Sequence, residues 1–268
     1  QHPGISLVPY PGDPMGDIKI TPFIAVPAAP GNEISIEGCR DQYESASFIL
    51  RPQRNTTGVQ IAVSNLVDGF GHTIPASSVD VYAIKVWYQA SLTGITYDDP
   101  MQYYQVPELL LKNDSLINVD FTNKINYIWA TKSGVTKYYD TSTPGATISW
   151  SATFDDAKTL QPFSINANEN KQIWMITHIP KTAVAGDYTG TVTITSTSES
   201  PIVMTFKVRI YPFDLVQPRL MYGIYYLGEL WNTDRTVLSA YDKTVATMRI
   251  ELKDITIGDS DVDVIVTV

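Results

Sequence analysis

The chain has 268 residues, a length that can bury a substantial hydrophobic core as one large domain or two smaller ones. Hydrophobic residues make up 44% and charged residues 18%, a balance that excludes a disordered chain and favours an ordered protein rich in strands. The 28 acidic and 19 basic residues give a formal charge of −9. Because no run of Lys or Arg offers a surface for phosphates, we expect no nucleic-acid partner.

Residues 1–16 hold four prolines and three glycines, a density that is incompatible with a helix and favours an extended N-terminal arm. The chain begins at Gln1 rather than at Met, which we interpret as a mature terminus left after removal of a signal peptide. We therefore expect an extracellular or cell-surface location. The arm has no evident partner in its own sequence, so it is also the expected contact of a homo-oligomer.

Residues 17–215 consist of short β-branched and aromatic runs bounded by Gly, Pro, Asn or Asp, a pattern that predicts strands. Residues 79–88 alternate between two apolar faces and are expected to form an inner strand covered on both sides. The segments GDYTGTVTITS and PIVMTFKVRIYPF predict a hairpin. The expected fold class is mainly β, with one or two Ig-like or jelly-roll-type antiparallel β-sandwiches. If there are two, they span about 17–145 and 146–215.

Residues 216–268 follow a different pattern, which predicts a short α/β segment. Apolar residues at helical spacing after Thr233 or Asp234 predict a helix that ends at about Lys253. A strand at about 222–226 precedes it, and the apolar strand VDVIVTV follows. We expect these two strands to pair in parallel through a right-handed crossover, with docking of the last strand on a neighbouring copy as the alternative.

Five segments carry a family resemblance: RDQYESASFILRP, VDVYAIKVWYQ, VPELLLKNDSLINVD, IPKTAVAGDYTGTVTI and YPFDLVQPRLMYGIYY. In this order they resemble the N-terminal β-sandwich region of secreted proteins related to glycoside hydrolase family 123, including those grouped as domain of unknown function 4091. The resemblance implies a sandwich followed by a (β/α) barrel, whose Asp–Glu pair works with the acetamido group of an N-acetylhexosamine. Residues 216–268 resemble only the start of that barrel, so the resemblance assigns catalysis to no residue here.

From this resemblance we expect a non-catalytic extracellular sandwich with a carbohydrate-associated or surface role. One alternative is a self-assembling subunit of a filament, tubule or sheath, joined through the N-terminal arm or the C-terminal strand. Another is a partial view of a glycoside hydrolase whose barrel is absent here. The aromatic segments YDDPMQYY and INYIW could stack on sugar rings. Core packing is the favoured interpretation of Trp87, Trp129, Trp150 and Trp174.

No residue pattern predicts a catalytic site or a cofactor. The lone Cys39 excludes an intrachain disulfide and is expected in the core. Glu44 and Arg51 are expected as outward polar side chains of one strand or as an ion pair across strands, with ligand binding as the alternative. No apolar run approaches the roughly 18 residues that span a bilayer. The histidines are too scattered to suggest a triad or a metal site: His2, His72 and His178.

The acidic residues suggest one metal candidate. Asp259, Asp261 and Asp263 alternate after Gly258, as the first ligands of a calcium loop do, but Val264 replaces the usual Gly and no Glu closes the loop. A solvated turn is the alternative interpretation. The adjacent pairs Asp98-Asp99 and Asp155-Asp156 point to opposite faces of an extended chain and are expected to form turns. Two triplets permit N-glycosylation, at Asn55 and Asn113.

Overall fold

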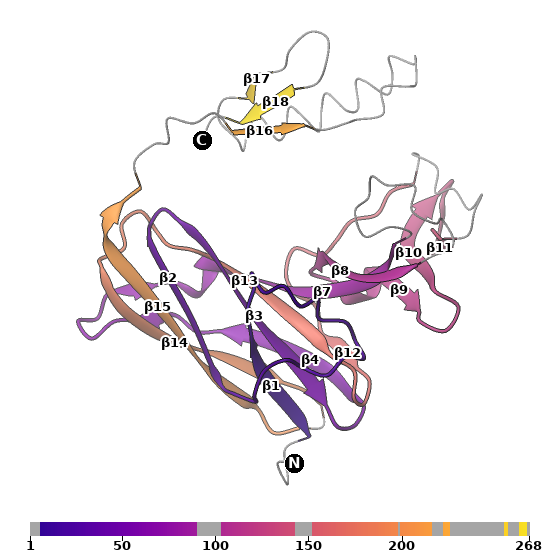
Figure 1. The fold of residues 1–268 in the computed structure, drawn as a ribbon, viewed down its shortest axis with the longest axis horizontal. Helices are drawn as coiled ribbons and strands as arrows, with labels where there is room; N and C mark the ends of the chain where they lie inside the picture. Colours follow the sequence, from indigo (N-terminus) through magenta and orange to yellow (C-terminus); the bar gives the residue numbers. More distant parts are fainter. Residues whose placement is uncertain are drawn as a thin grey trace. The chain divides into compact units, whose positions relative to one another are not determined.

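The computed structural model describes residues 6–89, 103–142, 152–197 and 199–215, together with the backbone of three strands nearer the C-terminus. Within these residues the protein is mainly β (Figure 1), as expected. The regular elements there are strands and two 3₁₀ turns, η1 (Ala76–Ser78) and η2 (Asp114–Leu116). The chain divides into two compact units, Gln1–Asp214 and Leu215–Val268.

Five strands of the first unit form one antiparallel sheet in the order β1-β3-β13-β7-β8. Strand β7 lies inside this sheet and buries neighbouring residues Ala83 and Ile84 on its two faces, which confirms the expected inner strand. The bounds of the strands are β1 (Leu7–Gly12), β3 (Tyr43–Pro52), β13 (Lys171–His178), β7 (Val79–Gln89) and β8 (Tyr104–Leu111).

A second sheet has seven strands, with the order β12-β4-β14-β15-β2; off this path, β5 pairs with β14 and β6 pairs with β5. The hairpin β14–β15 is confirmed. Strands β2 and β15 pair in parallel, so the expectation of a purely antiparallel sandwich is wrong. No tight turn fixes their direction, because they lie far apart in the sequence. The bounds are β12 (Phe163–Ile165), β4 (Thr56–Val63), β14 (Gly186–Thr195), β15 (Ile202–Asp214), β2 (Glu33–Arg40), β5 (Leu66–Val67) and β6 (Thr73–Ile74).

The two sheets face each other and share one hydrophobic core (Figure 1). Alternation builds this core, because every second residue of β14 and β15 points inward. Gly190 of β14 lies opposite Phe206 of β15. A side chain does not fit at Gly190, because an added Cβ would lie 2.8 Å from the carbonyl oxygen of Asn65. Both sheets combine strands from either side of residue 145, so the ranges 17–145 and 146–215 share this core. Its fully buried members include Phe48, Leu50, Ile173, Met175, Val192, Met204 and Phe206.

A three-stranded antiparallel sheet lies at one end of the sandwich (Figure 1). It consists of β9 (Ile117–Asp120), β10 (Ile125–Lys132) and β11 (Val135–Asp140), with β10 in the middle. The turn η2 leads from β8 into β9, so it joins the five-stranded sheet to the three-stranded one. Leu111, Leu116 and Ile117 form a small separate core at this junction.

Part of the proline-rich arm forms β1, which pairs along its whole length with β3. The expectation that the arm lacks a partner in its own chain is therefore wrong for Leu7–Gly12, and homo-oligomerisation through it stays a prediction. On the other edge of β1, the carbonyl oxygen of Pro9 accepts a hydrogen bond from Gly31 N at 3.1 Å. Since the N and C=O of one strand residue point the same way, the nitrogens of Pro9 and Pro11 both face away from β3.

The C-terminal unit contains β16 (Tyr222–Tyr225), β17 (Ile255–Thr256) and β18 (Asp263–Val266), with β18 between the other two. Strand β18 pairs with β16 of its own chain, as expected, but the pairing is antiparallel, so the expected parallel arrangement is wrong. Strand β17 pairs antiparallel with the other edge of β18. The helix expected up to about residue 253 lies outside the described residues, among which no α/β segment is seen.

Phe206 tests the shared core. We expect Phe206→Ala to lower the free energy of unfolding by about 3–5 kcal/mol, because the ring is fully buried between the sheets and its loss leaves a cavity. Val203→Ala on the same strand is the matched control, since Val203 is 51% exposed and should change stability by less than about 0.5 kcal/mol. Urea unfolding measures both variants, and equal losses would contradict a core between the two sheets.

Candidate functional site

A buried ion cluster fixes the turn η2 to the five-stranded sheet. Lys85 of β7 and Lys171 of β13 each lie two positions beyond the paired residues Ala83 and Ile173, so they face each other across neighbouring strands. Asp114 binds both: Lys171 Nζ donates to Oδ1 at 2.7 Å, and Lys85 Nζ donates to Oδ2 at 3.1 Å. Lys85 also donates to the Asp114 carbonyl oxygen at 2.9 Å. The carboxylate therefore holds together two cations that would otherwise repel each other.

The three side chains of this cluster are nearly shielded from water, with exposed fractions of 15% for Lys85, 14% for Asp114 and 11% for Lys171. Burial opposes ionisation of Asp114, but the positive charges of Lys171 and Lys85 outweigh it and hold the pKa of this carboxyl below its ordinary value. Burial lowers the pKa of Lys85, and Asp114 offsets part of that shift. The cluster is thus a charged arrangement with one more cation than anions.

Further hydrogen bonds fix η2 from outside the cluster. The side-chain oxygen of Asn113 accepts from Ser115 N at 3.1 Å and so caps the turn. Asp156 accepts from the backbone N–H groups of Lys112 and Asn113 at 2.6 and 2.7 Å, which confirms a turn-forming role for this acid. Tyr138 of β11 donates its hydroxyl to the Ser115 carbonyl oxygen at 2.5 Å. Through Tyr138, the position of η2 also determines the position of the β10–β11 hairpin.

One face of that hairpin carries exposed aromatic rings. Trp129 of β10 lies directly opposite Tyr138 of β11, and the two ring centroids are 5.0 Å apart at an angle of 64°. Trp129 is 44% exposed and Tyr138 is 37% exposed. The next cross-strand pair on this face is Thr131 and Thr136, whose hydroxyls form a hydrogen bond of 2.7 Å. We call the following six side chains the aromatic face: Tyr127, Trp129, Thr131, Thr136, Tyr138 and Asp140.

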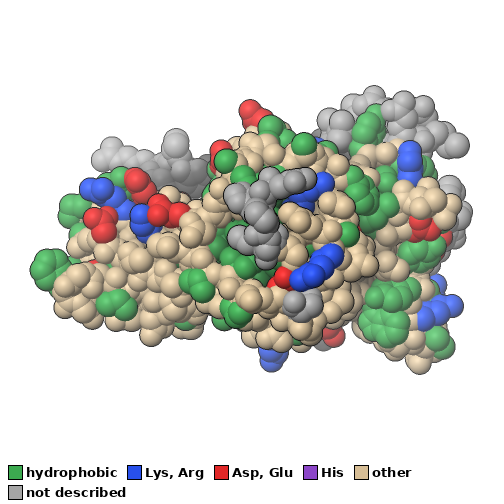
Figure 2. Space-filling view, turned by 90° about the horizontal axis from the view of Figure 1, so that it is seen from below, with side chains coloured by type: hydrophobic (Ala, Val, Ile, Leu, Met, Phe, Trp, Pro, Cys, Tyr) green, Lys and Arg blue, Asp and Glu red, His purple; other side chains and the backbone are tan. Residues whose placement is uncertain are grey.

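Figure 2 shows hydrophobic side chains at several places on this side of the molecule, its right-hand end included. Charged side chains of both signs are interspersed over the same view. Large aromatic surface beside hydroxyl groups suits a flat ligand with one apolar side and polar edges.

The aromatic face is not predicted from the sequence, as the four tryptophans show. Core packing is the interpretation that the sequence favours for all four, but Trp129 is exposed, so that expectation is wrong for it. The cause is that both faces of β10 carry aromatic or aliphatic residues, so the pattern does not say which face meets solvent. Trp87 is half-buried and donates its indole N–H to Glu108 at 2.9 Å, and Trp174 is also half-buried. Trp150 lies outside the described residues, as does most of the segment YDDPMQYY.

Residues 39–52, which include Cys39, Glu44 and Arg51, have structural roles. Cys39 is buried, as expected. Burial raises the pKa of Glu44, against a hydrogen bond from Gln42 that lowers it. Arg51 donates to the side-chain oxygen of Asn170 at 2.7 Å and to the carbonyl oxygen of Ile24 at 3.3 Å. Its partners among the described residues are thus an amide and a backbone group, so the expected ion pair is not formed there.

The remaining candidates do not come together in the described residues. His72 bonds Asp68 at 2.7 Å, and His178 bonds Asp41 at 3.2 Å and stacks on Tyr43. Asn55 is exposed and Asn113 is half-buried; glycosylation at either stays a prediction. His2, Asp98, Asp99, Asp259 and Asp261 lie outside the described residues, and Asp263 is described by its backbone alone.

No group of three or more His, Cys, Asp or Glu side chains in the described part of the chain is placed to hold a metal ion. That part also contains no helix with the length and hydropathy that a membrane crossing requires. The calcium candidate is untested by either observation.

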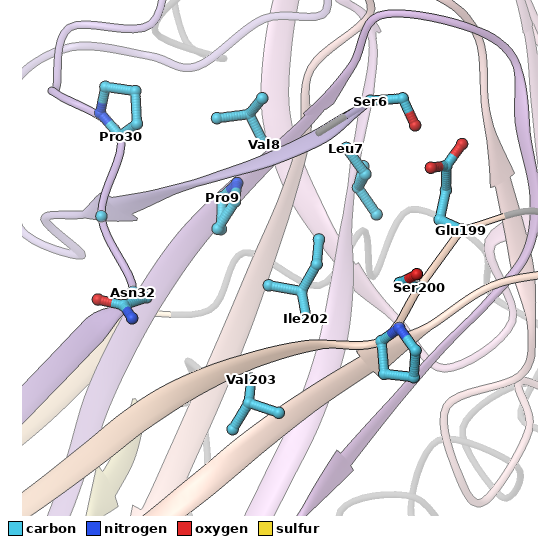
Figure 3. A pocket seen from close by; sticks show the side chains of 12 residues that line it. Ser6, Leu7, Val8, Pro9, Pro30, Asn32, Glu199, Ser200, Ile202 and Val203 are labelled. Atoms are coloured by element: carbon cyan, nitrogen blue, oxygen red, sulfur yellow. The ribbon is translucent and has the colours of Figure 1, made fainter. Parts of the chain in front are cut away.

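A separate cavity of about 480 Å³ lies where β1 and β15 begin (Figure 3). Leu7, Val8 and Ile202 contribute to an apolar wall, and Glu199 lies at one end beside Ser6. Arg54 donates to Glu199 Oε1 at 2.7 Å, and this hydrogen bond holds the pKa of Glu199 below its ordinary value. Because the carboxylate of Glu199 is already bound to Arg54, this cavity suits an apolar group better than a sugar.

Residues 30–196 match the family described as glycoside hydrolase 123 N-terminal domain. The chain belongs to this family. The matched residues extend from just before β2 to the end of β14 and include the ion cluster and the aromatic face. The resemblance expected from the sequence motifs is therefore confirmed. No curated protein matches the chain.

Among solved structures, this family 123 N-terminal domain is similar to a family 123 glycoside hydrolase from Clostridium perfringens, with 11% identity and a TM-score of 0.45 over 80% of this chain. The chain spans 28% of the length of that enzyme. It is also similar to the ASH/PapD-like domain 7 of human CEP192, with 9% identity and a TM-score of 0.23 over 76% of this chain and 100% of the domain. A third similar structure is AvmM, with 9% identity and a TM-score of 0.28 over 75% of this chain and 94% of AvmM. None of these likenesses bears on function.

Asp114 tests the ion cluster. We expect Asp114→Asn to lower the free energy of unfolding of the family 123 N-terminal domain by about 3–5 kcal/mol at neutral pH, because two buried ammonium groups lose their counterion. The folded pKa of Asp114 lies below its unfolded value, so its contribution is present above the unfolded pKa and is lost as pH falls through the folded pKa. Wild-type stability should therefore decline below about pH 4, and less so in the variant.

Urea unfolding at several pH values measures both effects. Asp155→Asn is the control, since Asp155 is exposed and its loss should change stability by less than about 0.5 kcal/mol. Parallel stability curves for the wild type and Asp114→Asn would show that the carboxylate does not carry the acid sensitivity.

Proposed function

We propose that this family 123 N-terminal domain is a non-catalytic, carbohydrate-associated sandwich of an extracellular or cell-surface protein, and that the aromatic face is where it contacts a glycan. The observation that carries the proposal is the exposed Trp129–Tyr138 pair. Exposed aromatic side chains held against each other offer a rigid apolar surface, and a sugar ring can lay its apolar side on such a surface.

The aromatic face is fixed before any ligand arrives, which supports a binding role. Tyr138 is tied to Ser115, and the turn that contains Ser115 is held by the buried ion cluster. A side chain that is already ordered loses little conformational entropy when a ligand binds. The hydroxyls of Thr131 and Thr136 lie beside the rings, where they can exchange hydrogen bonds with sugar hydroxyls.

Several carboxylates of the domain have structural roles, which supports the non-catalytic part of the proposal. Asp114 binds two lysines, Asp156 accepts from backbone N–H groups, and Glu199 binds Arg54. Engaged carboxylates of this kind are poor general acids or bases, because proton transfer needs a group free to reach the substrate.

The glycan class is suggested by the family. The chain belongs to the N-terminal domain family of glycoside hydrolase 123, and the family resemblance implies an enzyme that works with the acetamido group of an N-acetylhexosamine. We propose that the aromatic face takes oligosaccharides that contain N-acetylhexosamine, so that the domain holds a glycan while chemistry takes place elsewhere.

Trp129 tests the binding proposal. We expect the full chain to bind N-acetylhexosamine oligomers, and Trp129→Ala to raise the dissociation constant at least about tenfold because the larger ring of the pair is lost. Tyr138→Phe keeps the second ring but loses the hydrogen bond to Ser115 that orders it, so it should weaken binding by less than Trp129→Ala does. Val135→Ala, an exposed residue of the same hairpin, is the control and should bind as the wild type does.

Calorimetric titration measures these affinities. Flat titrations of the wild type at millimolar oligosaccharide, or equal affinity for Trp129→Ala and wild type, would show that the aromatic face is not a glycan site.

The non-catalytic proposal has its own test. We expect the chain to release no chromophore from aryl N-acetylhexosaminides, because Asp114, Asp156 and Glu199 are engaged in structural contacts. Turnover that a single Asp or Glu substitution in the described residues abolishes would overturn it.

A further inference from the structure

A second cavity, of about 200 Å³, lies between the five-stranded sheet, η2 and β9. We call it the polar cavity. Its wall includes all three members of the ion cluster together with Asn118, Phe121 and Glu169. It lies outside the aromatic face, whose six side chains contribute nothing to its wall. The volume is below the roughly 300–1,000 Å³ that is usual for drug-sized ligands, so it suits a smaller molecule.

The ammonium groups in this wall have more N–H donors than the protein uses. An ammonium has three N–H groups, and Lys171 donates one of them, to Asp114. Lys85 donates two, both to Asp114. Among the described residues no other acceptor takes the remaining N–H groups of these nearly buried side chains. Since both lysines line the polar cavity, these remaining N–H groups can donate to an acceptor that occupies it.

The charged side chains in the wall of the polar cavity have no net charge, and this favours a neutral ligand over a charged one. Lys85 and Lys171 supply two positive charges, and Asp114 and Glu169 supply two negative ones. Glu169 accepts from the side-chain amide of Asn166 at 2.7 Å through Oε2. A ligand with a net charge therefore meets an opposing group as well as a favourable one. A neutral molecule whose hydroxyls both accept and donate hydrogen bonds matches lysine donors beside carboxylate and amide acceptors.

The rest of the wall is held in place. Phe121 packs edge-on against Phe23 at 5.2 Å and Tyr88 at 6.0 Å between ring centroids, so its position is fixed. Asn170 donates to the carbonyl oxygens of Thr21 and Ile24, both at 2.9 Å, and accepts from Arg51. The polar cavity thus has a fixed aromatic ring beside fixed polar groups, and it needs no rearrangement to accept a ligand.

We propose that the polar cavity binds one neutral sugar ring and is a second carbohydrate site, separate from the aromatic face. The choice of a sugar among neutral polyols rests on the proposed function. Ring hydroxyls accept from Lys85 and Lys171 and donate to Asn118 and Glu169, while Phe121 contacts the apolar side of the ring.

The test uses the full chain and NMR signals of the lysine Nζ groups. We expect N-acetylglucosamine, N-acetylgalactosamine or galactose at millimolar concentration to shift the Nζ signals of Lys85 and Lys171 and to leave that of Lys207, an exposed lysine of β15, unchanged. Lys171→Met and Asn118→Ala should each weaken binding at least about tenfold. Lys171→Met leaves Asp114 paired with Lys85, and Asn118 is exposed, so both variants should fold; the wild-type unfolding midpoint is the check.

The controls separate this site from the aromatic face. Lys207→Met and Trp129→Ala should both leave the monosaccharide-induced shifts intact. Loss of the shifts in Trp129→Ala would mean that the sugar binds only at the aromatic face, and this would overturn the second site while supporting the proposed function. Shifts with glucuronate but with no neutral sugar would replace the neutral class by an anionic one and contradict the proposal. No shift with any of these probes would overturn it.

Discussion

The carboxylate of Asp114, bound between Lys85 and Lys171, is the interaction on which the end of the domain that carries the aromatic face depends. It lies in the turn that joins the five-stranded sheet to the three-stranded sheet, and together with the buried hydrogen bonds between Tyr88 and Asn126 it fixes the relative position of the two sheets. Buried ion clusters of this kind contribute little net stability, because desolvation offsets attraction. What they supply here is a defined position, which the small core around Leu116 could not supply alone.

The same turn lies between two surfaces of different character. On one side the hydroxyl of Tyr138 reaches the Ser115 carbonyl oxygen, and exposed rings follow along the hairpin. On the other side the lysines line the polar cavity. The β10–β11 hairpin carries exposed aromatic residues and would be mobile if a flexible loop attached it to the sandwich. The buried ion cluster instead holds the turn η2 to which it is attached. The large sandwich core thus contributes stability, and the ion cluster fixes the position of the turn.

Local patterns in the sequence are enough for part of this fold. The Val/Thr alternation of β14 and β15 predicts their hairpin, and the two apolar faces of β7 predict an inner strand, because strand periodicity and tight turns are local properties. The parallel pairing of β2 with β15 and the meeting of Lys85, Asp114 and Lys171 join residues far apart in the chain, and no local pattern encodes them. The exposure of Trp129 escapes sequence reasoning for a related cause, since exposure depends on which neighbouring element covers a face.

The prolines of β1 limit how this domain can associate. At Pro9 and Pro11 the outer edge of the five-stranded sheet has no N–H to offer, and the Pro9 carbonyl oxygen is already used by Gly31. A strand from another molecule that approached this edge would find no ladder to extend, so its own main-chain groups would lose water without gaining partners. Any association at this edge must therefore be made by side chains, whose complementarity can be specific to one partner, and the edge is protected from the indiscriminate main-chain pairing that leads to aggregation.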